Sequence, residues 1–350
     1  MTHLSVIVRS MARPSLAAAL ESIARQDCDL EIVLVSACGP AHPTPAAWCG
    51  RHPVRFVPGD GPRPRPAAAN AGLAQARGDW IGFLDDDDVF LPEHLRGLLD
   101  AIVRGAGVVY SYADAVFADG RHERFGQPFS LMQLYERSFI HLAASIVDRA
   151  LVAAGCRFDE TLDIHEDWDF FLQCAQHAPF RFVADARFQW NVEAGASGAA
   201  AGPNQDDARF AHFRDRVYDK WRPSRDALID RVVSLLGEAQ VRAARGDLPA
   251  AEAACAQALA ASPNDAYALN LLARVQHAGG RATQARATLE LATAVRPQDP
   301  GIATNLAQLC ADLGDLVAAR RHCAGALAAD AGYGPARQLA ERLRASPVRG

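Results

Sequence analysis

Four consecutive aspartates, Asp85–Asp88, are the side chains in this chain that most clearly indicate a binding or catalytic site. Neighbouring carboxylates repel one another, so such a cluster is favoured when a cation neutralises it. In an extended segment Asp85 and Asp87 lie on the same side of the chain. Carboxylate oxygens in this arrangement suit Mg²⁺ or Mn²⁺, with remaining coordination positions left for phosphate oxygens. The run therefore predicts a metal–diphosphate site.

Three simpler interpretations of the acidic run compete with the metal site. A solvated acidic loop is disfavoured because the apolar segment Trp80–Leu84 leads directly into the aspartates. A helix cap is disfavoured because Pro92 is expected at the first helical position, which makes Leu91 the cap. An EF-hand loop counted from the first aspartate would have Phe90 in place of glycine and Arg96 in place of glutamate. The metal site is thus the favoured interpretation.

The elements around the aspartates predict where they lie in the fold. Trp80–Leu84 is typical of a short buried strand, and a helix is expected over Pro92–Arg104. In open α/β sheets, ligands bind at the edge where the strands end. The acidic run therefore falls where a ligand site is expected.

The first part of the chain alternates between β-like and helical segments. This alternation predicts an α/β domain with a doubly wound parallel sheet. No GxGxxG motif follows the first strand and no GxxxxGK[ST] motif exists, which argues against a dinucleotide-binding fold and excludes a P-loop NTPase. The expected strands are 4–8, 31–35, 54–57 and 80–84, and the expected helices between them are 14–26 and 67–77.

A second acidic group lies at the start of a predicted helix, Ile164–Gln176. Trp168, Phe171, Leu172 and Ala175 have the spacing of one buried helical face. Glu166, Asp167 and Asp169 crowd the first turn, and by themselves they are typical of ordinary helix N-termini. Other elements expected here are strands 107–117, 142–147, 180–184 and 187–191, helical segments 131–135 and 148–154, a hairpin turn at 119–120 and a small-residue linker, 195–203.

A repeat of 34 residues organises the last third of the chain. Its phase is marked by glycines 246, 280 and 314 and by small residues at 251, 285 and 319. A helix–turn–helix period of this length resembles the tetratricopeptide repeat. We expect three repeats, 232–263, 266–297 and 300–333, and a capping helix, 335–345. The repeats either stabilise the chain or bind a partner, and the sequence leaves both roles open.

Composition restricts the class of protein. The chain has 350 residues, half of them hydrophobic, and a net charge of −5, which suggests two domains and gives no reason to expect a nucleic-acid partner. The eight cysteines have no CxxC spacing and are expected to be free thiols in a reducing cytosol. We expect neither a signal peptide nor a membrane span, and a cytoplasmic location, or a peripheral one at the inner membrane.

Three ordered blocks within residues 3–195 resemble the family 2 glycosyltransferases of the GT-A fold. They are SVIVRSMARPSLAAALESIARQ, AAANAGLAQARGDWIGFLDDDDVFLPEHL and FDETLDIHEDWDFFLQCA. The resemblance implies a GT-A Rossmann-like nucleotide-sugar-binding domain over residues 1–225, followed by an all-α tetratricopeptide solenoid over residues 226–350. It implies inverting transfer of a sugar from a nucleotide diphosphate donor to a glycan, lipid-linked or protein acceptor. A protein partner is a further expectation for the repeats.

The same resemblance assigns roles to acidic residues. The DxD motif of the family falls on Asp85 and Asp87, which implies that Asp85 lies near the ribose and that both residues serve a Mn²⁺ or Mg²⁺ ion. Asp86, between them, is expected at the nucleotide-sugar site. The ED pair of the family falls on Glu166 and Asp167, and Asp167 takes the place of the general base.

Other nucleotide-site positions depart from the family pattern. Arg9 and Ser10 stand where members often have Pro-Thr, and Ser36 begins the segment where an acid usually contacts the nucleobase. The arginine that often precedes the helix asparagine is missing, so Arg65 is expected to substitute for it near Asn70. All five residues are candidates for contact with the nucleotide sugar.

One further departure supports a rival hypothesis. Residues 191–192 are Asn-Val where many members have a metal-binding histidine. A non-catalytic tetratricopeptide scaffold with a degenerate transferase domain would tolerate this loss and the missing nucleobase acid. The intact Asp85, Asp87 and Asp167 favour the enzyme.

Overall fold

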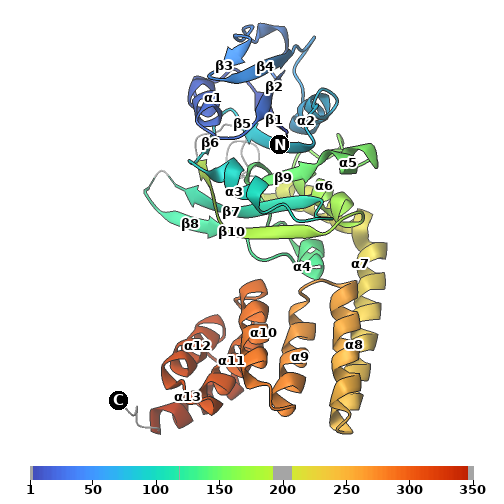
Figure 1. Cartoon of the computed structure of the whole chain (residues 1–350), viewed down its shortest axis with the longest axis vertical. Coiled ribbons are helices and arrows are strands. Elements are labelled where there is room, and N and C mark those ends of the chain that lie inside the picture. The colour runs from blue at the N-terminus through green and yellow to red at the C-terminus, as the bar shows by residue number, and fades with distance from the viewer. Residues whose placement is uncertain (1–2, 118, 192–206, 346–350) are drawn as a thin grey trace. The chain divides into compact units, whose positions relative to one another are not determined.

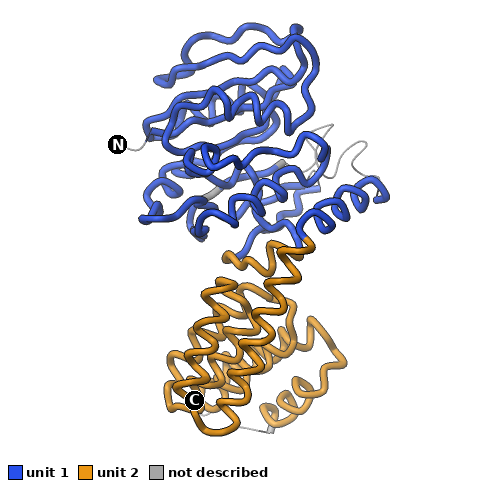
Figure 2. The backbone as a smooth tube through the Cα atoms, turned by 90° about the vertical axis from the view of Figure 1, so that its right-hand side faces the viewer, with its two compact units in different colours: residues 1–127, 137–221 blue, residues 128–136, 222–350 orange. Residues whose placement is uncertain are grey.

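The computed structural model describes residues 3–117, 119–191 and 207–345. The chain divides into two compact units (Figure 2): unit 1 is 1–127 with 137–221, and unit 2 is 128–136 with 222–350. The division falls inside one helix, α7 (Asp207–Ala244). Val192 and the predicted linker 195–203 lie outside the described residues.

Unit 1 is built on a twisted sheet, and four neighbouring strands in its first half are parallel (Figure 1). β1 (Leu4–Ser10) lies between β2 (Leu30–Ser36) and β5 (Trp80–Asp85), and all residues of β1 and β2 are buried. Strands covered on both faces need continuous apolar sequence, which explains the runs LSVIV and EIVLV. The remaining elements of this half are α1 (Leu16–Ala24), η1 (Gly39–Ala41), β3 (Trp48–Cys49), β4 (His52–Val57) and α2 (Arg65–Leu73).

The second half of the sheet is mixed, whereas β4, β2, β1 and β5, the strands for which a parallel sheet was predicted, are parallel. The cause is the short β9 (Ser145–Asp148), which inserts between β5 and β7 (Val108–Val116) and runs antiparallel to both. β10 (Phe180–Asn191) is parallel to β7, and its register shifts between Val183 and Arg187, where two strands were predicted. The other elements here are β6 (Val89–Phe90), which pairs with β10, and β8 (His122–Phe125), which pairs with β7.

Two local predictions near the acidic run and the middle of the chain also need correction. α3 (His94–Asp100) begins after Glu93, whose φ is 65°, so Pro92 lies in a turn and Leu91 is not the helix cap. Residues Leu142–Ala144 form a 3₁₀ turn, η2, and the strand predicted there begins only at Ser145. The short helices α4 (Leu131–Glu136) and α5 (Arg149–Ala153) lie where helical segments were predicted.

α6 (Glu166–Ala175) is anchored by its apolar face, as predicted. Trp168, Phe171 and Leu172 are buried, and so is Phe170, whose ring stacks on Phe158 with centroids 4.3 Å apart. Full burial of each such side chain contributes about 1.5–3 kcal/mol. The helix that carries Asp167 is therefore fixed from its inner side.

Unit 2 is a stack of helix pairs that confirms the tetratricopeptide repeats. Gly246, Gly280 and Gly314 have φ of 79°, 77° and 81°, a left-handed conformation that favours glycine and fixes the 34-residue period. The small residues 251, 285 and 319 are fully buried at the helix crossings. The helices after α7 are α8 (Leu248–Ala261), α9 (Ala266–Ala278), α10 (Ala282–Val295), α11 (Pro300–Asp312), α12 (Leu316–Ala329) and α13 (Gly334–Ala345).

Segment 128–136, which contains α4, packs as part of unit 2. Asn264 Nδ2 donates to the Phe129 carbonyl oxygen at 2.7 Å, and Arg296 forms an ion pair with Glu136. α7 is continuous through Pro223. Among the described residues, no helix combines the length and the apolar character that crossing a membrane requires.

Candidate active site

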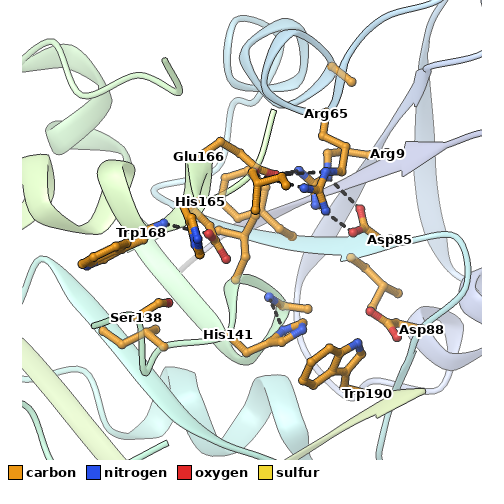
Figure 3. A pocket seen from close by; sticks show the side chains of 18 of the residues that line it. Arg9, Arg65, Asp85, Asp88, Ser138, His141, His165, Glu166, Trp168 and Trp190 are labelled. Carbon is orange, nitrogen blue, oxygen red and sulfur yellow. Dashed lines mark hydrogen bonds and ion pairs between the residues drawn. The ribbon is translucent and has the colours of Figure 1, made fainter. Parts of the chain in front are cut away.

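A cavity of about 910 Å³ lies in unit 1 (Figure 3). The loop after β5 and the first turn of α6 both contribute to its wall. The acids that line it are Asp85, Asp87, Asp88, Glu166 and Asp167. The two acidic groups noted in the sequence, about 80 residues apart, therefore face one cavity.

The first acidic group has the donor set for a divalent cation. Oxygen atoms of Asp85, Asp87 and Asp88 all lie within 4.8 Å of one another. Burial and the negative charge of Asp85 raise the pKa of Asp87, and the charge of Arg13 only partly opposes this. A hard cation would relieve that repulsion, so the residues present fit Mg²⁺ or Mn²⁺. Asp88, the last aspartate of the run, joins Asp85 and Asp87 as a candidate ligand.

Arg9 is bound to Asp85 by two parallel hydrogen bonds. Nε donates to Oδ1 and Nη2 to Oδ2, both at 2.7 Å, and the two residues are aligned in the pairing of β1 with β5. Burial favours the neutral form of Asp85, but the Arg9 guanidinium outweighs it and lowers the pKa of this carboxyl. Arg9 therefore holds Asp85 ionised and in a fixed orientation.

Asp86 and Ser10 lie behind the cavity wall and are not among its lining residues. Asp86 is fully buried and accepts hydrogen bonds from Ser10 Oγ at 3.0 Å and from Met11 N at 2.7 Å. Its carboxylate also forms an ion pair with Arg13. Asp86 thus holds the turn after β1, and its expected place at the nucleotide sugar is an indirect one.

Ser36 and Asn70 are also outside the lining. Ser36 Oγ donates to the Gly39 carbonyl oxygen at 2.7 Å, and Asn70 is bound to the backbone of Phe158 at 2.9 and 3.0 Å. Arg63, which the sequence analysis did not name, does line the cavity. Its only sequence signal is its place in the Arg-rich segment before α2.

Glu166 is held by two arginines. Its carboxylate lies 3.3 Å from Arg65 Nε and 3.4 Å from Arg9 Nη1, and 4 % of the side chain is exposed. Arg65 Nη2 also donates to the Asp163 carbonyl oxygen at 2.8 Å. The sequence prediction that Arg65 serves this region is consistent with its position, although its partner is Glu166 and not Asn70.

Asp167 is the acid best suited to accept a proton. Its Oδ1 accepts the Trp168 backbone N–H at 2.7 Å, and among the described residues it has no ion-pair partner within 4.0 Å. Burial raises the pKa of Asp167, with Arg65 as the main opposing influence. A raised pKa makes an ionised carboxylate a stronger base than the helix position alone would suggest.

Aromatic side chains form another part of the wall. His141 lies 5.1 Å from Trp190 between ring centroids, and Phe125 lies 6.4 Å from Trp190. Burial lowers the pKa of His141 to about 4, so this ring is neutral at pH 7. The wall also includes Phe210, Arg214 and Tyr218 of α7, which lie beyond the resembling blocks and so were missed.

The backbone before α6 has an uncommon conformation. His165 has φ of 66°, a left-handed value that is rare for a residue with a side chain. Its ring packs against Phe210, 4.4 Å away between centroids, and burial lowers its pKa to about 4. Uncommon backbone conformations of this kind are frequent at functional sites. Here the conformation sets the orientation of the next two residues, Glu166 and Asp167.

Comparison with known proteins gives matches in both parts of the chain. Residues 5–160 match the model for glycosyl transferase family 2, and residues 242–309 match a tetratricopeptide repeat model. The uncharacterized glycosyltransferase YwdF of Bacillus subtilis (strain 168) is 30% identical over 227 residues, which cover 61% of this chain and 82% of YwdF.

The chain belongs to glycosyl transferase family 2.

Two further matches of this family 2 transferase are one curated protein and one solved structure. The succinoglycan biosynthesis protein ExoO of Rhizobium meliloti (strain 1021) is 33% identical over 170 residues, 43% of this chain, which spans about half (49%) of ExoO. The crystal structure of S. aureus TarS 1-349 in complex with UDP-GlcNAc is similar at 15% identity and a TM-score of 0.49, covering 99% of this chain and 92% of that one. This family 2 transferase has an α/β domain followed by an all-α solenoid of tetratricopeptide repeats.

Proposed function

We propose that this transferase moves a sugar, with inversion, from a nucleotide diphosphate donor to a hydroxyl group of a glycan, lipid-linked or protein acceptor. The observation that carries the proposal is the joint position of Asp167 and of the cluster Asp85, Asp87 and Asp88 on one cavity. Family membership supports glycosyl transfer, and the cluster supports a diphosphate donor.

The donor end of the cavity is the aspartate cluster. Asp85, Asp87 and Asp88 would hold Mn²⁺ or Mg²⁺, and such an ion, when bound, supplies positive charge that stabilises a diphosphate leaving group. Arg9 keeps Asp85 ionised, and Arg65 and Arg63 add positive charge to the wall. Arg9 lines this end of the cavity. We propose that four residues outside the lining support its wall through their hydrogen bonds: Ser10, Ser36, Asn70 and Asp86.

The transfer step uses Asp167 as general base. Its carboxylate accepts the proton of the acceptor hydroxyl while that oxygen bonds to the anomeric carbon, and the bond to the diphosphate oxygen breaks with its electron pair leaving on the diphosphate. Attack opposite the leaving group inverts the anomeric carbon. Glu166 is less suited to this role because Arg9 and Arg65 both hold its carboxylate.

The repeats are proposed to bind a protein partner or the acceptor, and the location is proposed to be cytoplasmic or peripheral at the inner membrane. We do not favour the non-catalytic scaffold, because the acids needed for metal binding and proton transfer are present on one cavity.

The experiment that tests the proposal is nucleoside diphosphate release across a panel of sugar donors with Mn²⁺. We expect release with one donor class, dependent on Asp87. Absence of binding and release with every donor would contradict the enzyme and favour the scaffold.

A further inference from the structure

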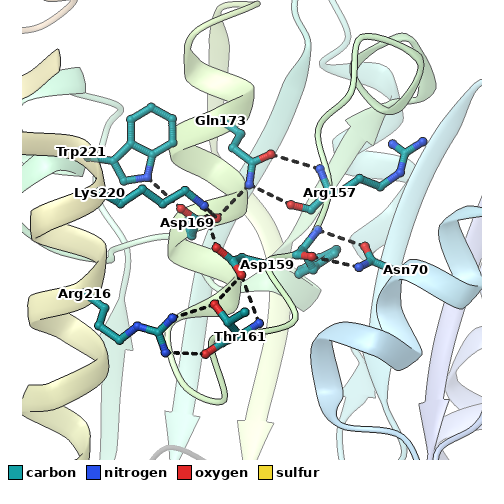
Figure 4. A network of polar contacts seen from close by, with 10 residues as sticks. Asn70, Arg157, Asp159, Thr161, Asp169, Gln173, Arg216, Lys220 and Trp221 are labelled. Carbon is teal, nitrogen blue, oxygen red and sulfur yellow. Dashed lines mark hydrogen bonds and ion pairs between the residues drawn. The ribbon is translucent and has the colours of Figure 1, made fainter. Parts of the chain in front are cut away.

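A polar network joins α6 to α7 (Figure 4), and its residues are not among those that line the cavity. Its centre is Asp169, which lies two residues after Asp167 and is fully buried. The Asp169 carboxylate accepts hydrogen bonds from Lys220 Nζ at 2.9 Å, Trp221 Nε1 at 2.8 Å and Gln173 Nε2 at 2.8 Å. Both oxygens of the buried carboxylate are therefore satisfied, two of the three donors being side chains of α7.

Lys220, the only lysine of the chain, is shared between two carboxylates. Its Nζ lies 2.9 Å from Asp169 Oδ2 and 2.9 Å from Asp159 Oδ2. Asp159 in turn accepts the Thr161 hydroxyl at 2.7 Å, and Arg216 donates to the Thr161 carbonyl oxygen at 2.7 Å. α7 thus binds both α6 and the loop that precedes it.

The same loop is held on its other side by α2. Asn70 Nδ2 donates to the Phe158 carbonyl oxygen at 2.9 Å. Arg65 donates to the Asp163 carbonyl oxygen and reaches Glu166, as described above. The first turn of α6 is therefore fixed from two directions. On the α7 side Arg209 and Arg216 bind the loop, through Asp163 and Thr161, and Lys220 is the cation that reaches the buried Asp169.

Helix geometry connects this network to the base. At 3.6 residues per turn, side chains two positions apart point in roughly opposite directions around the helix. Asp169 therefore faces α7 while Asp167 faces the cavity. A buried carboxylate that loses its cation is strongly destabilised, so the helix would shift to rehydrate Asp169. Such a shift would move Asp167.

We propose that Lys220 is a positioning residue for glycosyl transfer, which fixes the direction of Asp167 through Asp169 and Asp159. The proposal rests on the proposed function for the role of Asp167. It assigns a task to the helix that follows the transferase blocks, and it makes the chain's single lysine a functional residue.

The test uses the full chain with Lys220→Met and Lys220→Arg. A displacement of about 1 Å in a reacting group can cost about 10²-fold in rate, so we expect Lys220→Met to lower the kcat of transfer about 10- to 100-fold. The KM for the donor should change less than about twofold, because the cluster at Asp85 is untouched. Lys220→Arg keeps the charge and should recover most of the rate.

Two controls separate positioning from general stability. Arg55→Met breaks an ion pair with another buried carboxylate of unit 1, Glu31, at 3.4 Å, outside the residues that line the cavity, and should leave kcat unchanged. Trp221→Phe removes the Nε1 donor and the five-membered part of the indole but leaves the Lys220–Asp169 ion pair in place. It remains informative if Lys220→Met does not fold, and a smaller loss of kcat is expected.

Hydrogen exchange provides a readout that does not depend on activity. Lys220→Met should accelerate exchange in the first turn of α6 and not in β1 or β5. Unchanged exchange and unchanged kcat would overturn the proposal, and so would equal losses of kcat and donor binding. If Lys220→Met accelerates hydrogen exchange in the first turn of α6 but Asp167→Asn transfers sugar at the normal rate, the assignment of Asp167 as the base is wrong.

Discussion

Replacing Asp167 with asparagine separates general-base catalysis from the structural contacts of this side chain. The Asp167 carboxylate accepts one hydrogen bond, from the Trp168 backbone N–H, and an asparagine oxygen can accept the same bond. No ion pair within 4.0 Å is lost among the described residues. We therefore expect Asp167→Asn to fold and to bind nucleotide as the wild type does.

The expected loss lies in the chemical step. Loss of a general base costs about 10²–10⁴ in rate, which is about 2.7–5.4 kcal/mol of transition-state stabilisation. The raised pKa of Asp167 makes this carboxylate a good proton acceptor, so we expect a loss of at least about 100-fold. The assay is initial-rate transfer to acceptor, with nucleotide binding measured in parallel by calorimetry.

Glu166→Gln is the matched comparison in the same helical turn. It removes the negative charge that Arg9 and Arg65 contact, so it should lower the free energy of unfolding by about 1–3 kcal/mol. Asp167→Asn should change it little. Near wild-type transfer by Asp167→Asn, together with an inactive Glu166→Gln or Asp169→Asn, would refute the assignment of the base.

Three further predictions concern the metal, the pH dependence and the repeats. EDTA should abolish donor turnover, and Asp87→Asn should remove most of it at any Mn²⁺ concentration; full turnover in EDTA would rule out the metal site. Burial raises the pKa of Asp167, so its base form is lost at higher pH than in an ordinary aspartate. The acid limb of kcat/KM against pH should therefore lie at higher pH than an ordinary aspartate would give, and it should be absent in Asp167→Asn. A chain ending at Trp221 would expose the buried Phe129, Leu134 and Tyr135 of segment 128–136, so it should melt at lower temperature than the full chain; an equal melting temperature would show that unit 2 does not protect this segment.

Local sequence patterns predicted the elements that carry the acids. Trp80–Leu84 indicated a buried strand that ends at the aspartates, and the apolar spacing after Ile164 indicated the helix that carries Asp167. Both signals depend only on neighbours along the chain. The sequence also predicted the period of the repeats, because each glycine at 246, 280 and 314 is needed for a local left-handed turn.

The sequence alone did not predict contacts between distant segments. The pairing of Arg9 with Asp85 requires the register of β1 against β5, and a single sequence does not give that register. The direction of β9 is set by the path of the chain, because four residues contain too little pattern to distinguish parallel from antiparallel pairing. Lys220 meets Asp169 from 51 residues away.

Some residues predicted from the family pattern lie near the cavity but are not among the residues that line it. Ser10, Ser36, Asn70 and Asp86 all have buried or structural hydrogen-bond partners instead of an exposed position on the wall. Whether each polar side chain faces a ligand or its own backbone depends on turn geometry, which residue type alone does not determine.

The anomeric configuration of the product tests the central claim most directly. With Asp167 as a base opposite a diphosphate leaving group, transfer from a donor of known configuration should give the inverted glycoside, observed by NMR at early times with wild-type protein and Mn²⁺. The Asp167→Asn protein should give no product signal in the same period. A product with retained configuration would contradict single-step displacement and the assigned role of Asp167.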